Sequence, residues 1–344
     1  MVGEPDFQTP WMVRKAAVDS LERKRMVYTA NSGMADLRQE ICNYLKRKYD
    51  LTYHPENETL MTVGGSEAID LAIRAIVNPG DEVLIVEPSF VCYKPIVELM
   101  HGVEIPISTQ LKNKFKLTAE ELRSHITERP KLLILPYPNN PTGGIMTRED
   151  LEAIAEVLRD TNVLVLSDEI YSELTYGRKH VSIASIDGMW ERTIYVSGFS
   201  KAFAMTGWRL GYVCAPEPIA KQIHEMGIAQ LMVHNVVGDL LRNAIRAITR
   251  DGRTDGKILV IVGKKNETVE IDIFDNGANL PLEVLERFGT RGVTTGGTGN
   301  GLADLVEMLA AENISLVIRE NAGENSTYTK GFLLVFDGKN RREL

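Results

Sequence analysis

Between Leu60 and Val213 the chain alternates short apolar runs with helical stretches, and this alternation restricts its fold more than any other feature. Continuous apolar runs are typical of strands buried on both faces of a sheet. They occur at Val83–Val86, Leu132–Leu135, Val163–Leu166 and Ile194–Val196. Helical stretches lie among them, at Ser66–Val77, Thr118–Ile126 and Thr147–Leu158. Strands that alternate with helices predict an α/β fold with a mostly parallel sheet.

The pattern changes after about Met226, where a long amphipathic helix is expected at Leu231–Ile248. Strands then outnumber helices. They are expected at Lys257–Val262, Thr268–Phe274, Ser315–Arg319 and Phe332–Phe336, with a polar turn at Gly263–Glu267, one helix at Leu302–Glu312 and a solvated tail at Lys339–Leu344. Antiparallel strands packed with helices predict a smaller α+β sandwich. We therefore expect two domains, residues 1–226 and 227–344.

Charge and cysteine content exclude several classes of protein. Lys plus Arg number 39 and Asp plus Glu number 47, a net charge of −8, whereas nucleic-acid binders normally carry a basic face. The three cysteines lie far apart, which argues against a disulfide framework or a cysteine-rich zinc site. No apolar run approaches the roughly 20 residues that span a bilayer, and the N-terminus lacks the features of a signal peptide. We expect a soluble cytoplasmic protein without nucleic-acid or membrane partners.

Several short motifs in the first segment carry polar groups at the ends of predicted strands. Gly64-Gly65-Ser66-Glu67 joins a strand to a helix, where backbone N–H groups and the helix dipole attract anions. The later motifs are Asn139-Asn140-Pro141-Thr142-Gly143, Asp168, Ser197-Gly198-Phe199-Ser200-Lys201 and Gly207-Trp208-Arg209-Leu210-Gly211. The first four each have an ordinary structural explanation: a helix cap, a β-turn, an N-cap and a surface lysine, in that order.

Together and in this order, these motifs resemble the fold-type I pyridoxal-phosphate aminotransferases of classes I and II, over residues 3–226. The resemblance implies pyridoxal 5'-phosphate as cofactor and transfer of an amino group from an amino acid to a 2-oxo acid. Lys201 would form a Schiff base with the cofactor and then move the proton, because that chemistry needs an amine that can lose its own proton. Asp168 would keep the pyridine nitrogen protonated, as an electron sink requires.

The resemblance also implies the rest of the cofactor site. Asn140 and Tyr171 would donate hydrogen bonds to the ring oxygen, and Phe90 would stack on the ring, although packing in the core is its plainer role. A phosphate dianion needs a cation, hydroxyls and amides. These would come from Arg209, Ser200, Ser66 and the amides around Gly65 and Glu67. Tyr28 would reach the phosphate of a second subunit in a homodimer, and Gly3 would lie beside the substrate.

The sequence departs from this family after the large domain. No stretch resembles the small domain that carries the arginine for the substrate α-carboxylate, and the arm before Gly3 is short. The cofactor site is therefore expected to be complete, whereas half of the substrate site is expected to be missing.

The second segment has its own ordered motifs. Asp239 and Asn243 lie four residues apart, on one helix face, which alone indicates only a polar stripe. Asp275-Asn276-Gly277 closes a predicted strand, and Gly297-Thr298-Gly299-Asn300-Gly301 opens a helix. The trio resembles the ATP-binding domain of gyrase, heat-shock chaperones and histidine kinases (the GHKL superfamily), most closely the kinase version, over about 231–336.

That resemblance implies an ATP site with Mg²⁺. Asn243 would ligate the metal, since Mg²⁺ prefers oxygen ligands. Asp239 would lie near the attacking group and Arg246 would face the phosphates. Asp275 would accept the adenine amino hydrogen, with Gly277 letting the base approach. Gly297, Gly299 and Gly301 would form the lid over the phosphates, because glycine adopts backbone angles that other residues resist.

Histidine kinases also carry a phosphoacceptor histidine on a helical hairpin, and we find neither. His224 and His234 are nearby, but histidines on such helices are more often packed or solvent-facing. The alternatives to a fused aminotransferase are an ATP-binding signalling protein with the aminotransferase remnant as scaffold, and a non-catalytic cofactor binder. A natural fusion and a splice of two shortened genes both fit the sequence.

Overall fold

The computed structural model describes residues 3–23, 29–127, 129–265, 268–290, 301–311, 313–320, 327–337, 339 and 341–343. The chain forms two compact units, Met1–Ile228 and Ala229–Leu344. Across the described residues, none of the helices combines the length and the apolarity needed to cross a membrane.

The first unit is built on a seven-stranded sheet with the strand order β1-β7-β6-β5-β4-β2-β3. Strands β2 to β6 pair in parallel, and β7 runs antiparallel to β1 and β6. The strands are β1 Thr59–Thr62, β2 Glu82–Glu87, β3 Val103–Ser108, β4 Pro130–Leu135, β5 Leu164–Asp168, β6 Thr193–Gly198 and β7 Gly211–Cys214. The predicted mostly parallel α/β architecture is confirmed.

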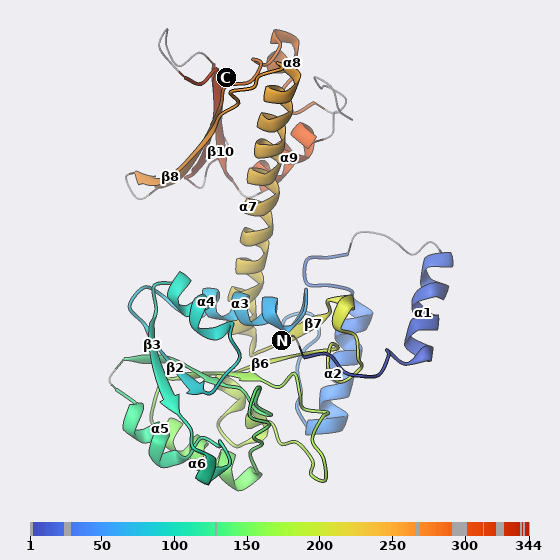
Figure 1. The fold of residues 1–344 in the computed structure, drawn as a ribbon, viewed down its shortest axis with the longest axis vertical. Coiled ribbons are helices and arrows are strands. Elements are labelled where there is room, and N and C mark those ends of the chain that lie inside the picture. Colours follow the sequence, from blue (N-terminus) through green and yellow to red (C-terminus); the bar gives the residue numbers. More distant parts are fainter. Residues whose placement is uncertain are drawn as a thin grey trace. The chain divides into compact units, whose positions relative to one another are not determined.

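Helices cover both faces of this sheet, which is why its central strands are apolar throughout (Figure 1). In β2, Val83 and Ile85 pack on one side in a core shared with α3, whereas Leu84 and Val86 pack on the other side with α5 and α6. The helices are α1 Trp11–Glu22, α2 Ala35–Tyr49, α3 Gly65–Ile76, α4 Tyr93–Leu99, α5 Ala119–His125 and α6 Arg148–Leu158. Capping boxes begin α5 and α6.

The second unit has a five-stranded sheet with the order β12-β10-β11-β9-β8. All its pairs are antiparallel except β10 with β12. Its elements are β8 Ile258–Lys265, β9 Thr268–Asp275, α8 Leu282–Glu286, α9 Gly301–Ala311, β10 Ser315–Glu320, β11 Lys330–Phe336 and β12 Arg342–Glu343. One face of the sheet packs against α9 and the later part of α7 (Glu217–Arg250). The predicted α+β sandwich is confirmed.

Three local predictions in this region were wrong. The helix expected to begin at Leu231 begins at Glu217, so α7 contains both the predicted junction and the boundary between the units. Ala220 and Ile223 of α7 join the core of the first unit, whereas Val236 and Leu240 join the core of the second. After about Met226 the helix therefore packs in a different core, but its secondary structure does not change.

The other two corrections concern strands. Strand β8 continues through the expected turn as far as Lys265, because its last residues pair with the start of β9. The C-terminal tail contributes β12, which pairs in parallel with Leu316 and Val317 of β10. In both cases pairing with a neighbouring strand overrides a locally polar sequence.

Candidate functional site

A cavity of about 690 Å³ lies in the first unit, beside the carboxyl ends of β5 and β6 and the start of α3. This is the edge of a parallel sheet where ligands of α/β proteins bind. Ten residues singled out from the sequence line it: Gly3, Gly65, Ser66, Phe90, Asn140, Asp168, Tyr171, Ser200, Lys201 and Arg209. The structure therefore brings together motifs that are spread over some two hundred positions of the sequence.

One end of the cavity suits an anion. Arg209 donates to the Val63 carbonyl at 3.3 Å and to the Thr206 carbonyl at 3.2 Å, so its guanidinium lies at the turn that begins α3. Gly64 has φ of 82°, a conformation that favours glycine, and a Cβ atom there would lie 3.0 Å from Cζ of Arg209 and displace the guanidinium. Arg209 itself has φ of 53°, a left-handed conformation that is costly for a residue with a side chain.

Glu67 and Tyr28 were also predicted for the phosphate site. Glu67 is not among the described residues that line the cavity. Its carboxylate accepts a hydrogen bond from the Val63 amide at 2.5 Å and caps the first turn of α3, whereas the predicted contact concerned the backbone amides of that turn. Tyr28 lies outside the described residues.

Lys201 reaches into the cavity from the loop after β6. Its Nζ donates to the carbonyl of Gly3 and lies 5.7 Å from the centre of the Tyr171 ring. Burial lowers the pKa of Lys201, and the charge of Arg209 lowers it further, whereas Glu4 opposes the shift. The amine is therefore easier to deprotonate than an ordinary lysine.

Asp168, the last residue of β5, supplies a buried carboxyl group to the same cavity. Its Oδ2 accepts a hydrogen bond from the Tyr93 hydroxyl at 2.7 Å, and its Oδ1 accepts one from the Ile170 amide at 3.2 Å. Burial raises the pKa of Asp168, and these two hydrogen bonds oppose the shift. Tyr93 is almost fully buried, and no sequence motif pointed to it.

The neighbouring asparagines have different tasks. Asn139 is fixed in the turn, where it donates to the Pro88 carbonyl at 3.1 Å and accepts from the Thr142 hydroxyl at 2.8 Å. Asn140 lines the cavity instead. Tyr171 lines it too, and burial together with the charge of Asp168 raises the pKa of its phenol. Tyr171 therefore remains a hydrogen-bond donor at neutral pH.

This set of groups fits pyridoxal phosphate. The cavity presents a guanidinium, two hydroxyls and a helix N-terminus at one end, a buried carboxylate, two neutral donors and a primary amine. The phosphate of the cofactor needs the guanidinium, hydroxyls and amides, and its protonated ring nitrogen needs the carboxylate. Its ring oxygen needs the two neutral donors, and its aldehyde needs the primary amine. Phe90 lines the cavity and also packs against the core, so both of its predicted roles remain open.

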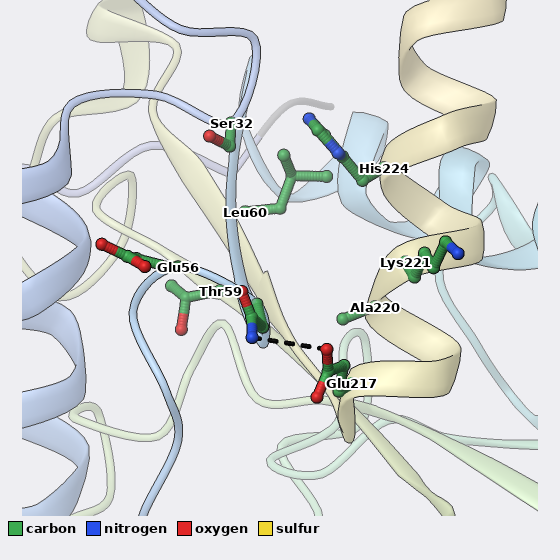
Figure 2. Close-up of a pocket in the computed structure, with 9 residues that line it drawn as sticks. Ser32, Glu56, Thr59, Leu60, Glu217, Ala220, Lys221 and His224 are labelled. Carbon is green, nitrogen blue, oxygen red and sulfur yellow. Dashed lines mark hydrogen bonds between the residues drawn. The ribbon is translucent and has the colours of Figure 1, made fainter.

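A smaller cavity of about 210 Å³ in the first unit holds none of the predicted site residues (Figure 2). It lies between β1 and the first turns of α7, where the Asn57 side chain donates to Glu217 at 3.3 Å. The Nε2 atom of His224 is buried there without a hydrogen-bond partner among the described residues.

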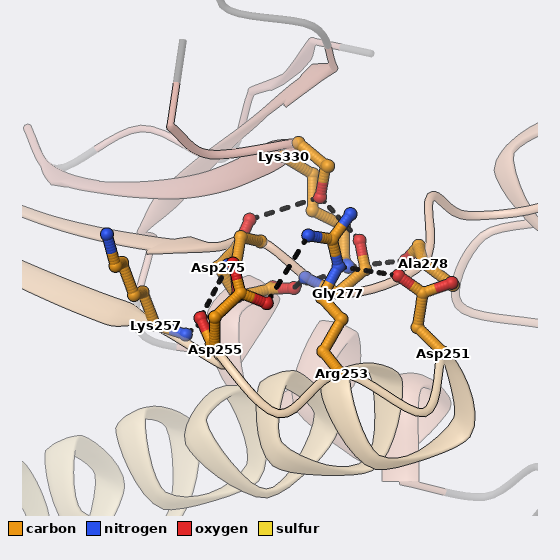
Figure 3. Close-up of polar contacts among 10 residues, drawn as sticks. Asp251, Arg253, Asp255, Lys257, Asp275, Gly277, Ala278 and Lys330 are labelled. Carbon is orange, nitrogen blue, oxygen red and sulfur yellow. Dashed lines mark hydrogen bonds and ion pairs between the residues drawn. The ribbon is translucent and has the colours of Figure 1, made fainter.

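In the second unit, Asp275 lies at the end of β9 and is fully buried (Figure 3). Its Oδ1 accepts hydrogen bonds from the Gly277 amide at 2.9 Å and from Nζ of Lys330 at 2.7 Å. Its Oδ2 is buried without a partner among the described residues. An unsatisfied buried acceptor fits the predicted contact with an amino group of a ligand.

The other predicted nucleotide residues lie on α7 or near α9. Asp239 forms an ion pair with Arg242 at 2.5 Å, Asn243 is half-buried, and Arg246 is exposed. Gly301 begins α9, whereas Gly297 and Gly299 lie outside the described residues. A Cβ atom at Gly277 would lie 2.6 Å from the carbonyl carbon of Ala247, so this glycine is required for the loop to approach α7.

Comparisons with known proteins match both units. Residues 1–250 match the family model of aminotransferase class I and II, and residues 229–335 match that of the histidine kinase-, DNA gyrase B-, and HSP90-like ATPase. The two matches overlap on residues 229–250, which belong to α7.

Relatives of the first unit are aminotransferases by name. The chain is 52% identical over 215 residues to the "Putative aminotransferase YugH" of Bacillus subtilis, which covers 62% of this chain and 56% of that protein. It is 42% identical over 223 residues to an aspartate aminotransferase of Pyrococcus abyssi, covering 64% of this chain and 57% of that one. The solved structure of an aspartate aminotransferase from Thermus thermophilus with maleate superposes with a TM-score of 0.64 at 30% identity, covering 78% and 75% of the two chains.

The chain thus spans little more than half the length of these two curated relatives. The aminotransferase model nevertheless covers most of the chain, and the ATPase model covers the unit that follows. The chain therefore belongs to the class I and II aminotransferase family, and its residues 229–335 match the histidine kinase-, DNA gyrase B-, and HSP90-like ATPase model.

Proposed function

We propose that the first unit binds pyridoxal phosphate covalently at Lys201 and transfers an amino group from an amino acid to a 2-oxo acid. The observation that carries the proposal is that Lys201, Asp168 and Arg209 line one cavity. Arg209, Ser66, Ser200 and the first amides of α3 would hold the phosphate. Asp168 would hold the protonated ring nitrogen, and Asn140 and Tyr171 would donate to the ring oxygen.

When bound, the cofactor supplies an electron sink for the bond electrons of a substrate α-carbon. The chain's own groups do the rest. The lowered pKa of Lys201 favours the neutral form of its amine, which would bind the cofactor and later carry a proton to or from the substrate carbon. Asp168 is kept away from water and oriented by Tyr93, so it would be able to hold the protonated ring nitrogen.

The cavity offers fewer charged groups for the substrate than for the cofactor. Lys201 and Arg209 are the cationic side chains among the described residues that line the cavity. If Arg209 holds the phosphate, this lining offers no further cation for a substrate α-carboxylate. Cofactor binding is thus the better supported half of the proposal, and the amino acid and the 2-oxo acid would bind with low affinity.

The test separates these two halves. Purified protein with pyridoxal phosphate should show the visible absorption of the lysine-bound cofactor, and Lys201→Ala should lose that band while keeping its far-UV circular dichroism. Lys112→Ala, an exposed lysine outside the cavity, is the matched control and should keep the band. A band that survives in Lys201→Ala would refute the proposed role. Adding amino donors to the loaded protein then tests transfer, and no spectral conversion with any donor would reduce the unit to a cofactor binder.

We propose further that the chain is a homodimer and that the second unit binds ATP with Mg²⁺. Helix α1 has no buried residue and exposes Trp11 and Met12 at 63% and 82%, which favours a partner surface over it. In the second unit, Asn243 would ligate Mg²⁺, Asp239 would lie near the attacking group and Arg246 would face the phosphates. Gly297, Gly299 and Gly301 would form the lid. The buried, unpartnered Oδ2 of Asp275 supports an adenine site.

A further inference from the structure

Lys330, the first residue of β11, is a buried lysine that no motif predicted. It is 4% exposed and stands opposite Asp275 in the register of β11 and β9. Its Nζ contacts Oδ1 of Asp275 at 2.7 Å and the carbonyl of Ala278 at 2.6 Å (Figure 3). Lysine is almost never fully buried unless it is paired, so this ammonium is tied to the aspartate.

The pair makes the two oxygens of Asp275 unequal. Oδ1 is saturated by Lys330 and by the Gly277 amide, whereas Oδ2 has no partner among the described residues. The surrounding loop is fixed separately, since Thr329 donates to the Gly277 carbonyl at 2.5 Å and Asn276 accepts from the Lys257 amide at 2.7 Å. The free oxygen is therefore held in one direction by a rigid frame.

An ammonium only donates hydrogen bonds, and a carboxylate only accepts them. Lys330 and Asp275 form an ion pair at 2.7 Å, and in that pair Oδ2 can accept a hydrogen bond from a ligand but cannot donate one. A ligand carbonyl placed there would face a negative acceptor. The Gly277 turn, which follows Asp275, packs against Ala247 of α7, one helical turn after the predicted metal ligand Asn243.

We propose that Lys330 is the positioning residue that determines base selectivity in the second unit. Lys330 balances the charge of Asp275 and occupies Oδ1, which leaves Oδ2 as an acceptor only. Such an acceptor selects a purine with an amino group at C6 and rejects one with a carbonyl there. This inference rests on the proposed ATP binding of the second unit and adds a residue that the sequence motifs do not include.

The experiment compares ATP with inosine triphosphate, which has a carbonyl at C6 in place of the amino group and a hydrogen on N1. Affinities with Mg²⁺ are measured by isothermal titration calorimetry on the full chain. A site that hydrogen-bonds an amino group rejects an analogue lacking it by about tenfold or more. We expect that preference in the unmodified chain and a fall to within about threefold in Lys330→Met, because an unpaired buried carboxyl group takes up a proton and can then donate to the carbonyl.

Arg319→Met is the matched control. Arg319 forms an ion pair with Asp272 at 2.8 Å on the same sheet, but the alternation of β9 puts Asp272 on the face opposite to Asp275. Removing this pair should leave the preference for ATP unchanged. If Lys330→Met lowers the unfolding temperature but also keeps the full preference, Lys330 is only structural and the inference is wrong.

A second variant covers the case in which Lys330→Met does not fold. Asp275→Asn combined with Lys330→Met removes both charges together, so no unpaired charge is buried. An amide can accept or donate, and we expect this variant to bind the two nucleotides about equally. A retained preference for ATP would overturn the inference, whereas an unmodified chain that binds neither nucleotide would overturn the proposed ATP function itself.

Discussion

At the scale of single residues, the chemistry of the first unit depends on how easily Lys201 loses its proton. Burial and Arg209 lower its pKa, and Glu4 is the charge that opposes them. Glu4→Gln should therefore lower the pKa further and shift the pH dependence of cofactor capture to lower pH. Because Glu4 is exposed and screened by salt, we expect a shift of roughly 0.5 pH unit or less, largest at low ionic strength.

The shift is measured as the rate at which the visible band forms between pH 6 and 10. Asp6→Asn is the control, since Asp6 is not among the charges that act on Lys201. A shift to higher pH in Glu4→Gln, or an equal shift in Asp6→Asn, would show that the charge of Glu4 does not act on this amine.

At the scale of elements, strand β7 determines where the phosphate end of the cavity lies. A Cβ atom at Gly211 would lie 2.6 Å from the amide nitrogen of Gly65, which is backbone that cannot rotate away. Gly211→Ala should therefore push β7 from the turn that begins α3, at a cost of about 1–3 kcal/mol in unfolding free energy. It should also weaken cofactor binding, because the amides of that turn would move.

Urea denaturation measures the loss of unfolding free energy in Gly211→Ala, and titration with pyridoxal phosphate measures the weaker cofactor binding. Gly207→Ala is the control in the same loop region, since a Cβ atom there meets nothing within 4 Å. It should unfold at the same urea concentration as the unmodified chain. An equal loss in both variants would contradict the role given to the packing of β7.

At the scale of the whole molecule, each unit has its own core and its own proposed ligand. A ligand that binds only the native state stabilises it by about 2.7 kcal/mol at a concentration of 100 Kd. In calorimetry, pyridoxal phosphate should raise the unfolding temperature of the first unit and Mg²⁺-ATP that of the second. Asn243→Ala should remove the ATP effect and leave the cofactor effect intact; an ATP effect that persists would refute the metal role of Asn243.

The sequence alone determined the two fold classes, the central strands and the motifs that matter. Apolar runs and helical periods are local properties, so the α/β layer and the sandwich after it could be predicted, and ordered motifs led to ten residues that line one cavity. Strand pairing is not local, and for that reason the ends of β8 and the existence of β12 were missed.

Only the tertiary structure decided the partners of the buried charges. Tyr93 is 75 positions from Asp168 and Lys330 is 55 from Asp275, so no spacing in the sequence links them. Each pair forms because folding removes a carboxyl group from water and a donor must be brought to it from another strand or helix. Helix α7 is a further feature that only the tertiary structure decided. The change of pattern near Met226 suggested two separate segments, whereas one continuous helix contributes residues to both cores.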